Sequence, residues 1–203
     1  RNTASEFGRS VAISGDWLAV GCPRDNQAGG RAGSVYLFRR EAPGVWAQAA
    51  KLTSPLPRRG TEWGHFVALS GETLAVGEAD CPADGSGGAT LLRLGADGVW
   101  QVDQILDLPT AEAEGPFHIS LALRGSRLLV GARRDRAGLG SAFLYDRGDS
   151  GWTLSAEFQM PAGWVDSQIP APDLGHNLAL GKATAAIGAR FADAGAPDAG
   201  LAL

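Results

Sequence analysis

The chain has 203 residues, a formal net charge of -4 and 44% hydrophobic residues, and it contains 29 glycines. This composition is typical of a folded, turn-rich globular protein and excludes a disordered chain. The apolar runs fall short of the roughly 18 residues that a membrane-spanning helix needs, so no membrane span is expected. Basic and acidic residues are interspersed instead of forming a basic stripe, which argues against a nucleic-acid partner.

One fifteen-residue pattern occurs four times along the chain. The first copy is FGRSVAISGDWLAVG at 7–21, and the later copies begin at Trp63, Phe117 and Leu174, at spacings of 56, 54 and 57 residues. Recurrence at a nearly constant interval predicts four copies of one supersecondary unit in a single repeat region. The predicted repeats span about 7–57, 63–110, 117–162 and 174–203.

Each copy begins with a short run in which an alanine lies between two large aliphatic residues, as Ala12 lies between Val11 and Ile13. With a period of two, the aliphatic side chains point to one face and the alanine to the other. This pattern predicts an inner strand that is buried on both sides between stacked sheets. A glycine turn such as Gly15 then predicts a tight hairpin into a second strand, which ends on a glycine such as Gly21.

Two further strands complete each repeat. A third strand, 33–40 in the first copy, follows a polar loop, and a fourth strand opens on Trp46, Trp100 or Trp152, which we expect to pack within the sheets. The fourth copy ends within its third strand. The sequence therefore predicts an all-β β-propeller of four four-stranded antiparallel blades, the last of them incomplete, in which neighbouring blades bury each other's faces.

These residues resemble the FG-GAP repeat family in its bacterial form and, more distantly, the propeller of integrin α subunits. The first copy carries the resemblance in FGRSVAISGD, AGSVYLF and AKLT, whereas Trp63 and Leu174 replace the Phe of later copies and His118 replaces a Gly. The resemblance implies a β-propeller. It also implies a secreted or cell-surface module that serves adhesion, scaffolding or binding of a protein or glycan.

Integrin-type propellers often hold calcium in a DxDxDG loop between the first two strands, where this chain has only a short turn. Acidic groupings follow the second strands instead, at Asp25 with Asn26, Asp80 with Asp84, and Asp193 with Asp198. Calcium requires about six to eight oxygen ligands, so these residues either form a calcium site or stabilise turns. We predict turns, with no metal and no cofactor.

The two cysteines occupy corresponding loops of consecutive repeats. Cys22 and Cys81 each precede a proline just after a second strand. Loops on the same rim can bring two cysteines to disulfide distance, and an oxidising compartment favours the bond. Two interpretations stay open, namely a Cys22–Cys81 disulfide or two unreactive thiols.

Five residues are candidates for ligand binding. His65, His118 and His176 occupy nearly equivalent positions in different repeats, where they either line a binding site near a central channel or have structural roles. Trp17 and Trp164 lie off the repeat pattern, where an exposed ring can stack on a sugar or anchor a protein, or simply pack locally. Catalytic motifs such as GxSxG or HExxH are absent from the sequence, and we predict no enzyme activity.

Three functional hypotheses follow. The first is a noncatalytic extracellular or cell-surface module that binds protein or glycan. The second is an accessory propeller domain of a secreted hydrolase or lyase, and the third is a lectin with sugar sites between blades. Fold alone does not separate these classes.

Four repeats are few for a propeller of this kind, which commonly has about seven blades. The open alternatives are a compact four-bladed ring, half of a ring completed by a second chain, and a fragment of a longer polypeptide. Residues 1–6 contain no initiator Met and no apolar signal core, which favours a processed or excerpted chain. We predict that the first strand (7–14) or the last (200–203) contacts another chain or further residues of the polypeptide.

Overall fold

The computed structural model describes residues 5–79, 88–109, 118–133, 139–160, 173–189 and 201–202. The regular elements of these residues are β-strands, which form four antiparallel sheets. No helix in the described ranges is long and apolar enough to cross a membrane. The predicted all-β class is therefore confirmed.

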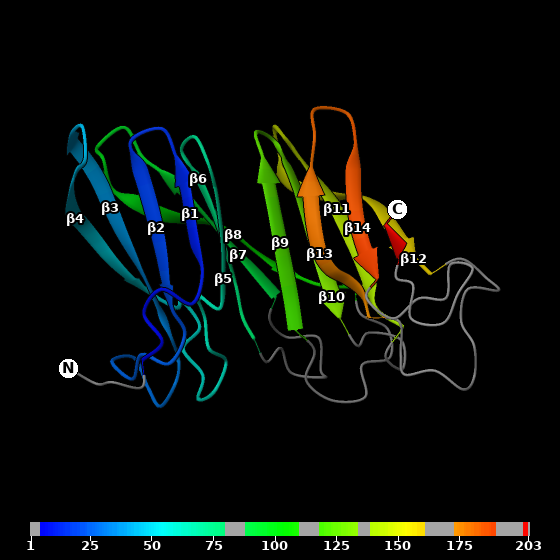
Figure 1. The fold of residues 1–203 in the computed structure, drawn as a ribbon, viewed down its shortest axis with the longest axis horizontal. Coiled ribbons are helices and arrows are strands. Elements are labelled where there is room, and N and C mark those ends of the chain that lie inside the picture. The colour runs from blue at the N-terminus through cyan, green and yellow to red at the C-terminus, as the bar shows by residue number, and fades with distance from the viewer. Residues whose placement is uncertain are drawn as a thin grey trace. The chain divides into compact units, whose positions relative to one another are not determined.

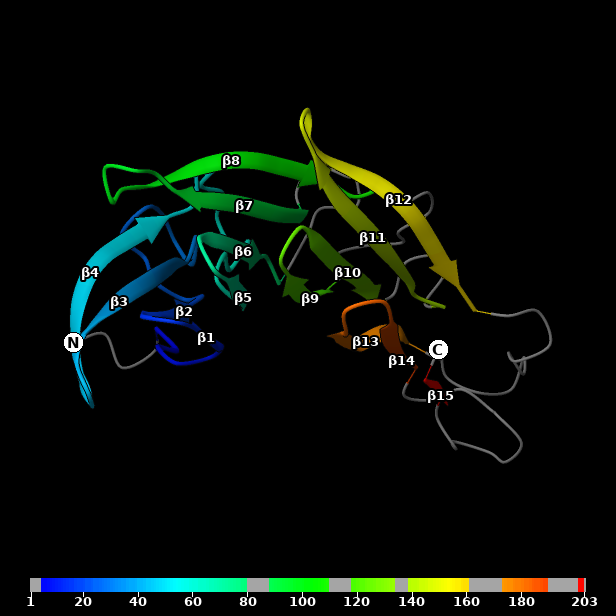
Figure 2. The ribbon, with the colours of Figure 1, turned by 90° about the horizontal axis from the view of Figure 1, so that it is seen from above.

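Each sheet is a meander in which the strands lie side by side in chain order, as Figure 2 shows for β1 to β4. Blade 1 consists of β1 (Val11–Ser14), β2 (Trp17–Cys22), β3 (Ser34–Ala42) and β4 (Val45–Thr53). Blade 2 consists of β5 (Phe66–Ser70), β6 (Thr73–Gly77), β7 (Gly88–Leu94) and β8 (Trp100–Asp107). Blade 3 consists of β9 (His118–Arg124), β10 (Arg127–Arg133), β11 (Ser141–Gly148) and β12 (Gly151–Gln159). Blade 4 has three described strands, β13 (Leu174–Leu180), β14 (Ala185–Ala189) and β15 (Leu201–Ala202).

The chain divides into two compact units (Figure 1). Unit 1 comprises Arg1–Asp80 and Ala89–Leu106 and holds blades 1 and 2. Unit 2 comprises Cys81–Gly88 and Asp107–Leu203 and holds blades 3 and 4. Each unit is thus a pair of consecutive blades.

The hairpin between the first two strands forms as the sequence predicts. Gly15, Gly71 and Gly125 each have a φ of 57°, a left-handed conformation that glycine adopts without steric cost. The same turn closes blades 1, 2 and 3. Ser14 consequently pairs with Trp17 across the first hairpin, and the two inner strands stay in register back to Val11.

A hydrophobic core lies between the two blades of each unit. In unit 1 the core joins buried residues of both sheets, namely Ala19, Val35, Leu37, Trp63, Leu69, Leu74, Val76, Leu92 and Trp100. In unit 2 the corresponding core contains Leu129, Ala142, Leu144, Leu174, Ile187 and Ala189. Because the residues come from two sheets in each case, a blade depends on its neighbour for burial, as the repeat pattern predicts.

Consecutive blades also meet through their backbones, at a joint that recurs in both units. Gly33, just before β3, forms a parallel bridge with Trp63 of the next blade. Gly140 forms the same bridge with Leu174 in unit 2. Trp63 N donates to Ala32 O at 3.1 Å in the first joint. A short backbone-to-backbone contact therefore joins the two consecutive blades of each unit.

A glycine near the end of β2, and another near the end of β10, makes this joint possible. A Cβ at Gly21 would collide with the carbonyl oxygen of Gly64, and one at Gly131 would collide with that of Gly175. A serine hydroxyl strengthens the contact. Ser10 Oγ donates to Gly64 O at 3.2 Å, and its counterpart in blade 3 donates to Gly175 O at 2.5 Å.

The prediction that every inner strand is buried on both sides is wrong for β1 and for β13, where Ala179 is exposed. Ala12 packs against the core of unit 1, but Val11 and Ile13 are each 64% exposed. The reason is that only a neighbouring blade covers this face, and none of the residues described covers it on blade 1. The predicted packing of the fourth-strand tryptophans is confirmed at Trp100 and Trp152, which are buried.

Candidate binding site

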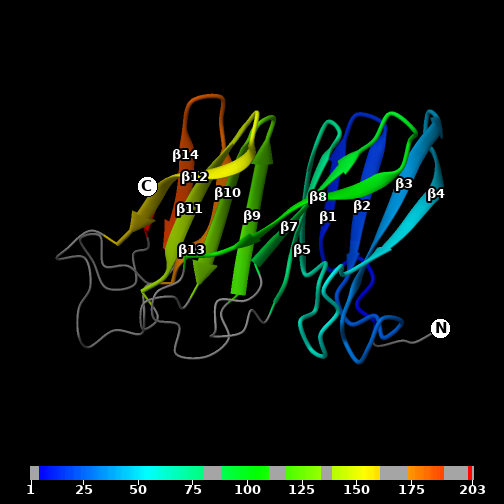
Figure 3. The same cartoon turned by 180° about the vertical axis from the view of Figure 1, so that it is seen from behind.

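Two loops of unit 1 lie together at the end opposite the β1–β2 and β5–β6 hairpins (Figures 1 and 3). They are the β2–β3 loop (23–33) and the β4–β5 loop (54–65). Backbone hydrogen bonds join them, since Gly60 N donates to Gly30 O at 3.0 Å and Glu62 N donates to Arg31 O at 3.1 Å. The two loops therefore form one platform, here called the arginine rim because it carries Arg24, Arg31, Arg58 and Arg59.

Two residues of the arginine rim adopt backbone conformations that side chains disfavour. Arg31 has a φ of 57° and Glu62 a φ of 52°. A left-handed non-glycine residue costs on the order of 1 kcal/mol and persists only where its surroundings fix it. Arg31 N is fixed by donating to Asn26 Oδ1 at 2.7 Å. The ion pairs between Arg31 and Glu62 supply the remaining restraint.

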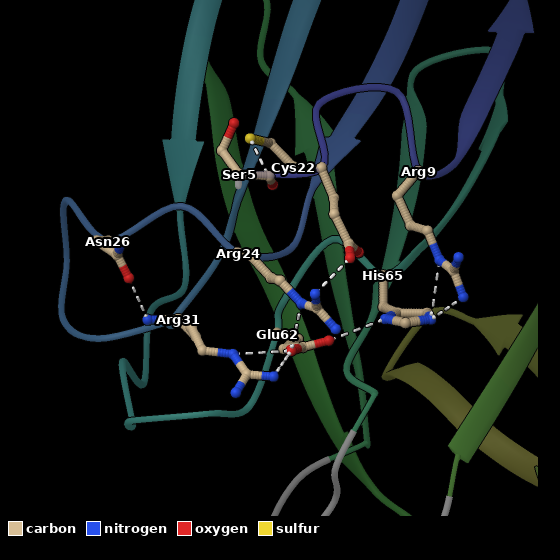
Figure 4. A network of polar contacts seen from close by, with 9 residues as sticks. Ser5, Arg9, Cys22, Arg24, Asn26, Arg31, Glu62 and His65 are labelled. Atoms are coloured by element: carbon tan, nitrogen blue, oxygen red, sulfur yellow. Dashed lines mark hydrogen bonds and ion pairs between the residues drawn. The ribbon is translucent and has the colours of Figure 1, made fainter. Parts of the chain in front are cut away.

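The carboxylate of Glu62 is the centre of a network of charged side chains (Figure 4). Its side chain is 5% exposed, and Oε1 accepts from Arg24 Nε at 3.1 Å, Arg31 Nε at 3.1 Å and Arg31 Nη2 at 2.6 Å. Burial alone would raise the pKa of Glu62, but the hydrogen bonds from Arg31 and Arg24 outweigh it and lower the pKa. Glu62 is therefore ionised at neutral pH and anchors both guanidinium groups.

His65, a predicted ligand-binding residue, belongs to the same network. Its Nε2 lies 3.3 Å from Arg9 Nε and 3.1 Å from Arg9 Nη2, and its Nδ1 lies 3.4 Å from Glu62 Oε2. Arginine can only donate, so Nε2 must accept and the ring proton sits on Nδ1, which is near Glu62 Oε2 but makes no hydrogen bond to it. His65 thus couples β5 to the loop before β1. Whether it contacts a ligand stays a prediction.

The outer side of the arginine rim presents guanidinium groups to solvent. The side chains of Arg24 and Arg31 are 42% and 56% exposed although both are anchored on Glu62. Arg59 is exposed beside Gly30 and makes no polar contact within the described ranges. A guanidinium presents a planar fork of donors that matches a carboxylate, sulfate or phosphate. The rim is therefore suited to an anionic group.

A second polar cluster orders the β2–β3 loop. Asp25 Oδ2 lies 2.6 Å from Lys51 Nζ and accepts from Ser34 Oγ at 2.8 Å, while Oδ1 accepts from Gln27 N at 2.9 Å. Burial raises the pKa of Asp25, but these hydrogen bonds dominate and lower it. Asp25 therefore stabilises a turn, as predicted. The other acidic pairs predicted from sequence lie outside the residues described. The described residues contain no group of three or more His, Cys, Asp or Glu side chains that could hold a metal ion.

One carboxylate beside the arginine rim has a raised pKa. Glu78, directly after β6, is buried, and its Oε2 lies 3.7 Å from Arg58 Nη2. Burial raises the pKa of Glu78 to about 7, and the charge of Arg58 only partly opposes this. Glu78 therefore changes charge near neutral pH. It occupies the position of Cys22 in the repeat.

The structure does not gather the other predicted site residues around this rim. Trp17 is half-buried, and its ring packs edge-on against Trp100 at 5.4 Å with the Arg39 guanidinium 5.9 Å from its centroid. His176 is half-buried on β13 in unit 2. His118 begins β9, but the structure does not describe its side chain. Trp164 lies outside the described residues.

The disulfide hypothesis also stays a prediction. Cys22 is buried as a free cysteine, and its thiol donates to Ser5 O at 3.3 Å. Cys81 lies outside the described residues. Its position relative to Cys22 therefore gives no test of the pairing.

Sequence reasoning missed the Glu62 network, although a signal for it exists. An acid precedes the first residue of three copies, at Glu6, Glu62 and Asp173, and all three acids have a positive φ. In both units the acid before the second blade lies beside an arginine at, or just after, the end of the second strand of the preceding blade. The pairs are Arg24–Glu62 at 3.1 Å and Arg133–Asp173 at 3.7 Å. Aligning the copies one residue further back would have revealed the motif.

Comparison with known proteins supports the fold. Residues 2–38 match the FG-GAP repeat family. No curated protein matches the chain. A crystal structure of a protein from Lactobacillus plantarum is similar, with a TM-score of 0.50 and 17% identity over 77% of this chain and 43% of the other. The periplasmic gluconolactonase of Pseudomonas aeruginosa matches with a TM-score of 0.44 and 14% identity over 88% of this chain and 64% of the other.

The four sheets are antiparallel meanders, and within each unit the two consecutive blades bury each other's faces, as in a β-propeller fold. The segment that matches the FG-GAP repeat family includes β1, β2 and the beginning of β3, in agreement with the resemblance noted in the sequence. The chain spans less than half of the length of the Lactobacillus plantarum protein. At these identities the likeness to solved structures concerns the fold alone.

Proposed function

We propose that this chain is a noncatalytic extracellular or cell-surface binding module, and that the arginine rim of unit 1 recognises an anionic group on a glycan or a protein. The observation that carries the proposal is the pair of half-exposed guanidinium groups, on Arg24 and Arg31, that buried Glu62 holds in place. A binding group that is already ordered loses less conformational entropy when its ligand arrives.

The charge balance of the rim supports an anionic ligand. Four arginines lie on the two loops, whereas the carboxylates that contact them are buried Glu62, buried Glu78 and Glu6, whose side chain is 31% exposed and lies 2.7 Å from Arg24 Nη1. The protein as a whole carries a formal net charge of -4. The arginine rim is therefore a positively charged surface on a protein of negative net charge, and such a surface attracts a negatively charged ligand.

The test is binding to immobilised heparin, with polyglutamate as a carboxylate-only probe and dextran as an uncharged one. We expect retention on at least one anionic probe, none on dextran, and weakening by added salt because exposed ion pairs are screened. The informative variants are Arg59→Gln and Arg31→Gln. Arg59 makes no polar contact within the residues described, so its replacement should weaken binding without altering the fold.

The matched control is Arg39→Gln. Arg39 is also exposed, but it lies on β3 beside Trp17 and not on the rim. Equal loss of binding in Arg39→Gln and Arg59→Gln would show that only net charge matters, which would refute recognition at the rim. Failure of the wild-type protein to bind either anionic probe would also refute it.

A further inference from the structure

Within each unit, the joint between the two blades pairs two different faces of the repeat. The preceding blade presents its alanine face, which in blade 1 carries Ala12 and Ala19. The following blade presents its aliphatic face, which in blade 2 carries Trp63, Val67 and Leu69. Unit 2 repeats the pairing: Ala122 of blade 3 and the aliphatic face of blade 4, Leu174 with Leu178 and Leu180, pack in one core.

Blade 1 carries an aliphatic face that none of the described residues covers. Phe7, Val11 and Ile13 are 55%, 64% and 64% exposed. The counterparts of Phe7, Trp63 in blade 2 and Leu174 in blade 4, are 0% exposed, and those of Val11 and Ile13 are buried or half-buried. The same residue pattern is thus buried where an alanine face lies against it and exposed where none does.

Blade 4 carries an alanine face that is exposed in the same way. Ala179 and Ala186, the counterparts of Ala12 and Ala19, are both exposed. Gly188 repeats Gly21, yet the atoms nearest to an added Cβ there belong to Asn177 of its own blade, at 3.5 Å or more. The carbonyl that crowds Gly21 in the blade 1–2 joint has no counterpart at Gly188 among the residues described.

Gly8 supplies the other half of that missing contact. It has a φ of 91°, close to the 90° of Gly64 and the 85° of Gly175, whose carbonyls close the two joints. Nothing lies within 4 Å of a Cβ built at Gly8, whereas one at Gly64 or Gly175 would meet the backbone of the preceding blade. Gly8 and Gly188 therefore have the conformation and the space of the two sides of one more joint.

We propose that the aliphatic face of blade 1 binds the alanine face of blade 4 of a second copy of this chain. The occupant is argued from the chain's own two joints, which show what each face packs against and which glycines it uses. The contact joins two different faces, so it is heterologous, and it generates a closed ring of copies or an open chain of them. It involves a different surface from the arginine rim.

The test measures mass by light scattering across the micromolar to millimolar range of protein concentration. We expect the wild-type protein to exceed the mass of one chain as concentration rises. Val11→Glu with Ile13→Glu removes the aliphatic face, and Ala179→Glu with Ala186→Glu removes the alanine face. Each double variant alone should remain a monomer, because a buried unpaired charge opposes the contact.

Mixing the two double variants gives the decisive result. Each retains the face that the other lacks, so a one-to-one mixture should form dimers and nothing larger. Val102→Glu, which alters an exposed apolar residue of β8 outside both faces, should associate like the wild type. Thermal unfolding checks that each variant is folded.

Three outcomes would overturn the proposal. The first is a wild-type protein that stays monomeric over the whole range, as expected if further blades of a longer polypeptide cover these faces. The second is association that survives replacement of the alanine face, which would indicate that two copies of blade 1 meet face to face. The third is a mixture that does not form dimers.

Discussion

The joint of unit 1 and the joint of unit 2 have the same backbone arrangement but different side chains. Both contain a glycine under a carbonyl oxygen, a serine hydroxyl on that oxygen and a parallel bridge to the next blade. In unit 1 the buried side chain at the bridge is Trp63, whose Nε1 donates to Thr90 Oγ1 at 3.0 Å. In unit 2 it is Leu174.

The ion pairs beside the two joints differ more than the buried side chains do. Glu62 accepts three hydrogen bonds from arginines at 3.1 Å or less, whereas Asp173 Oδ2 lies 3.7 Å from Arg133 Nη1. The backbone contact is therefore the structural element that joins blades, and the side chains around it are free to vary. In unit 1 that variation orders an arginine-bearing surface, on which our functional proposal depends.

The largest expected effect comes from breaking the shared backbone contact. Gly21→Ala and Gly131→Ala each place a Cβ against a carbonyl oxygen of the next blade, which should cost about 3 kcal/mol of the free energy of unfolding or more. Gly188→Ala is the matched control, because the space at Gly188 accepts a Cβ, and it should change stability by no more than about 1 kcal/mol. Urea unfolding measures all three. Equal losses would contradict the role of the joint.

The next largest effect should be a loss of stability that is greater on replacing Glu62 than on replacing Asp173. Glu62→Gln removes the charge that anchors Arg24 and Arg31 and should destabilise unit 1 by about 2 to 3 kcal/mol at neutral pH. Because the pKa of Glu62 is lowered in the folded state, its stabilisation exists above the unfolded pKa and is lost as pH falls through the folded pKa. The variant should therefore approach the wild type in acid. Asp173→Asn is the comparison in unit 2 and should cost less than Glu62→Gln, given the longer ion pair to Arg133.

Trp63→Leu makes the unit 1 joint resemble that of unit 2. We expect a loss of about 2 kcal/mol, because the smaller side chain leaves a cavity and Thr90 loses its hydrogen bond. The glycine contact should hold the blades together, so unfolding should stay cooperative. A non-cooperative transition would mean that Trp63, and not the backbone contact, joins the blades.

The smallest expected effect is a pH dependence confined to unit 1. Glu78 has its pKa raised to about 7, so the stability tied to its protonated form is full below the unfolded pKa and is lost as pH rises through about 7. Glu78→Gln should be more stable than the wild type by about 1 to 2 kcal/mol at alkaline pH and by less in acid. Ala132, which occupies the same repeat position in blade 3, cannot titrate. A constant difference across pH would contradict this assignment.

The sequence predicted the sheets well because the two-residue alternation of each strand recurs in every copy of the pattern. Copies of one pattern identified the strands and the turn glycines. It did not reveal which aliphatic faces are covered, since Val11 and Val67 look alike in sequence and differ only in what lies against them. The Glu62 network was missed because its members come from loops more than 30 residues apart, which only the fold brings together.

Amide hydrogen exchange at Trp63 and Leu174 tests the central claim most directly, because both backbone N–H groups donate across a joint. Trp63 N donates to Ala32 O at 3.1 Å and Leu174 N donates to Leu139 O at 3.0 Å. If the backbone contact joins consecutive blades, both amides should exchange as slowly as the amides of the second strands, by opening of the whole unit. Exchange as fast as that of exposed loop amides would contradict it.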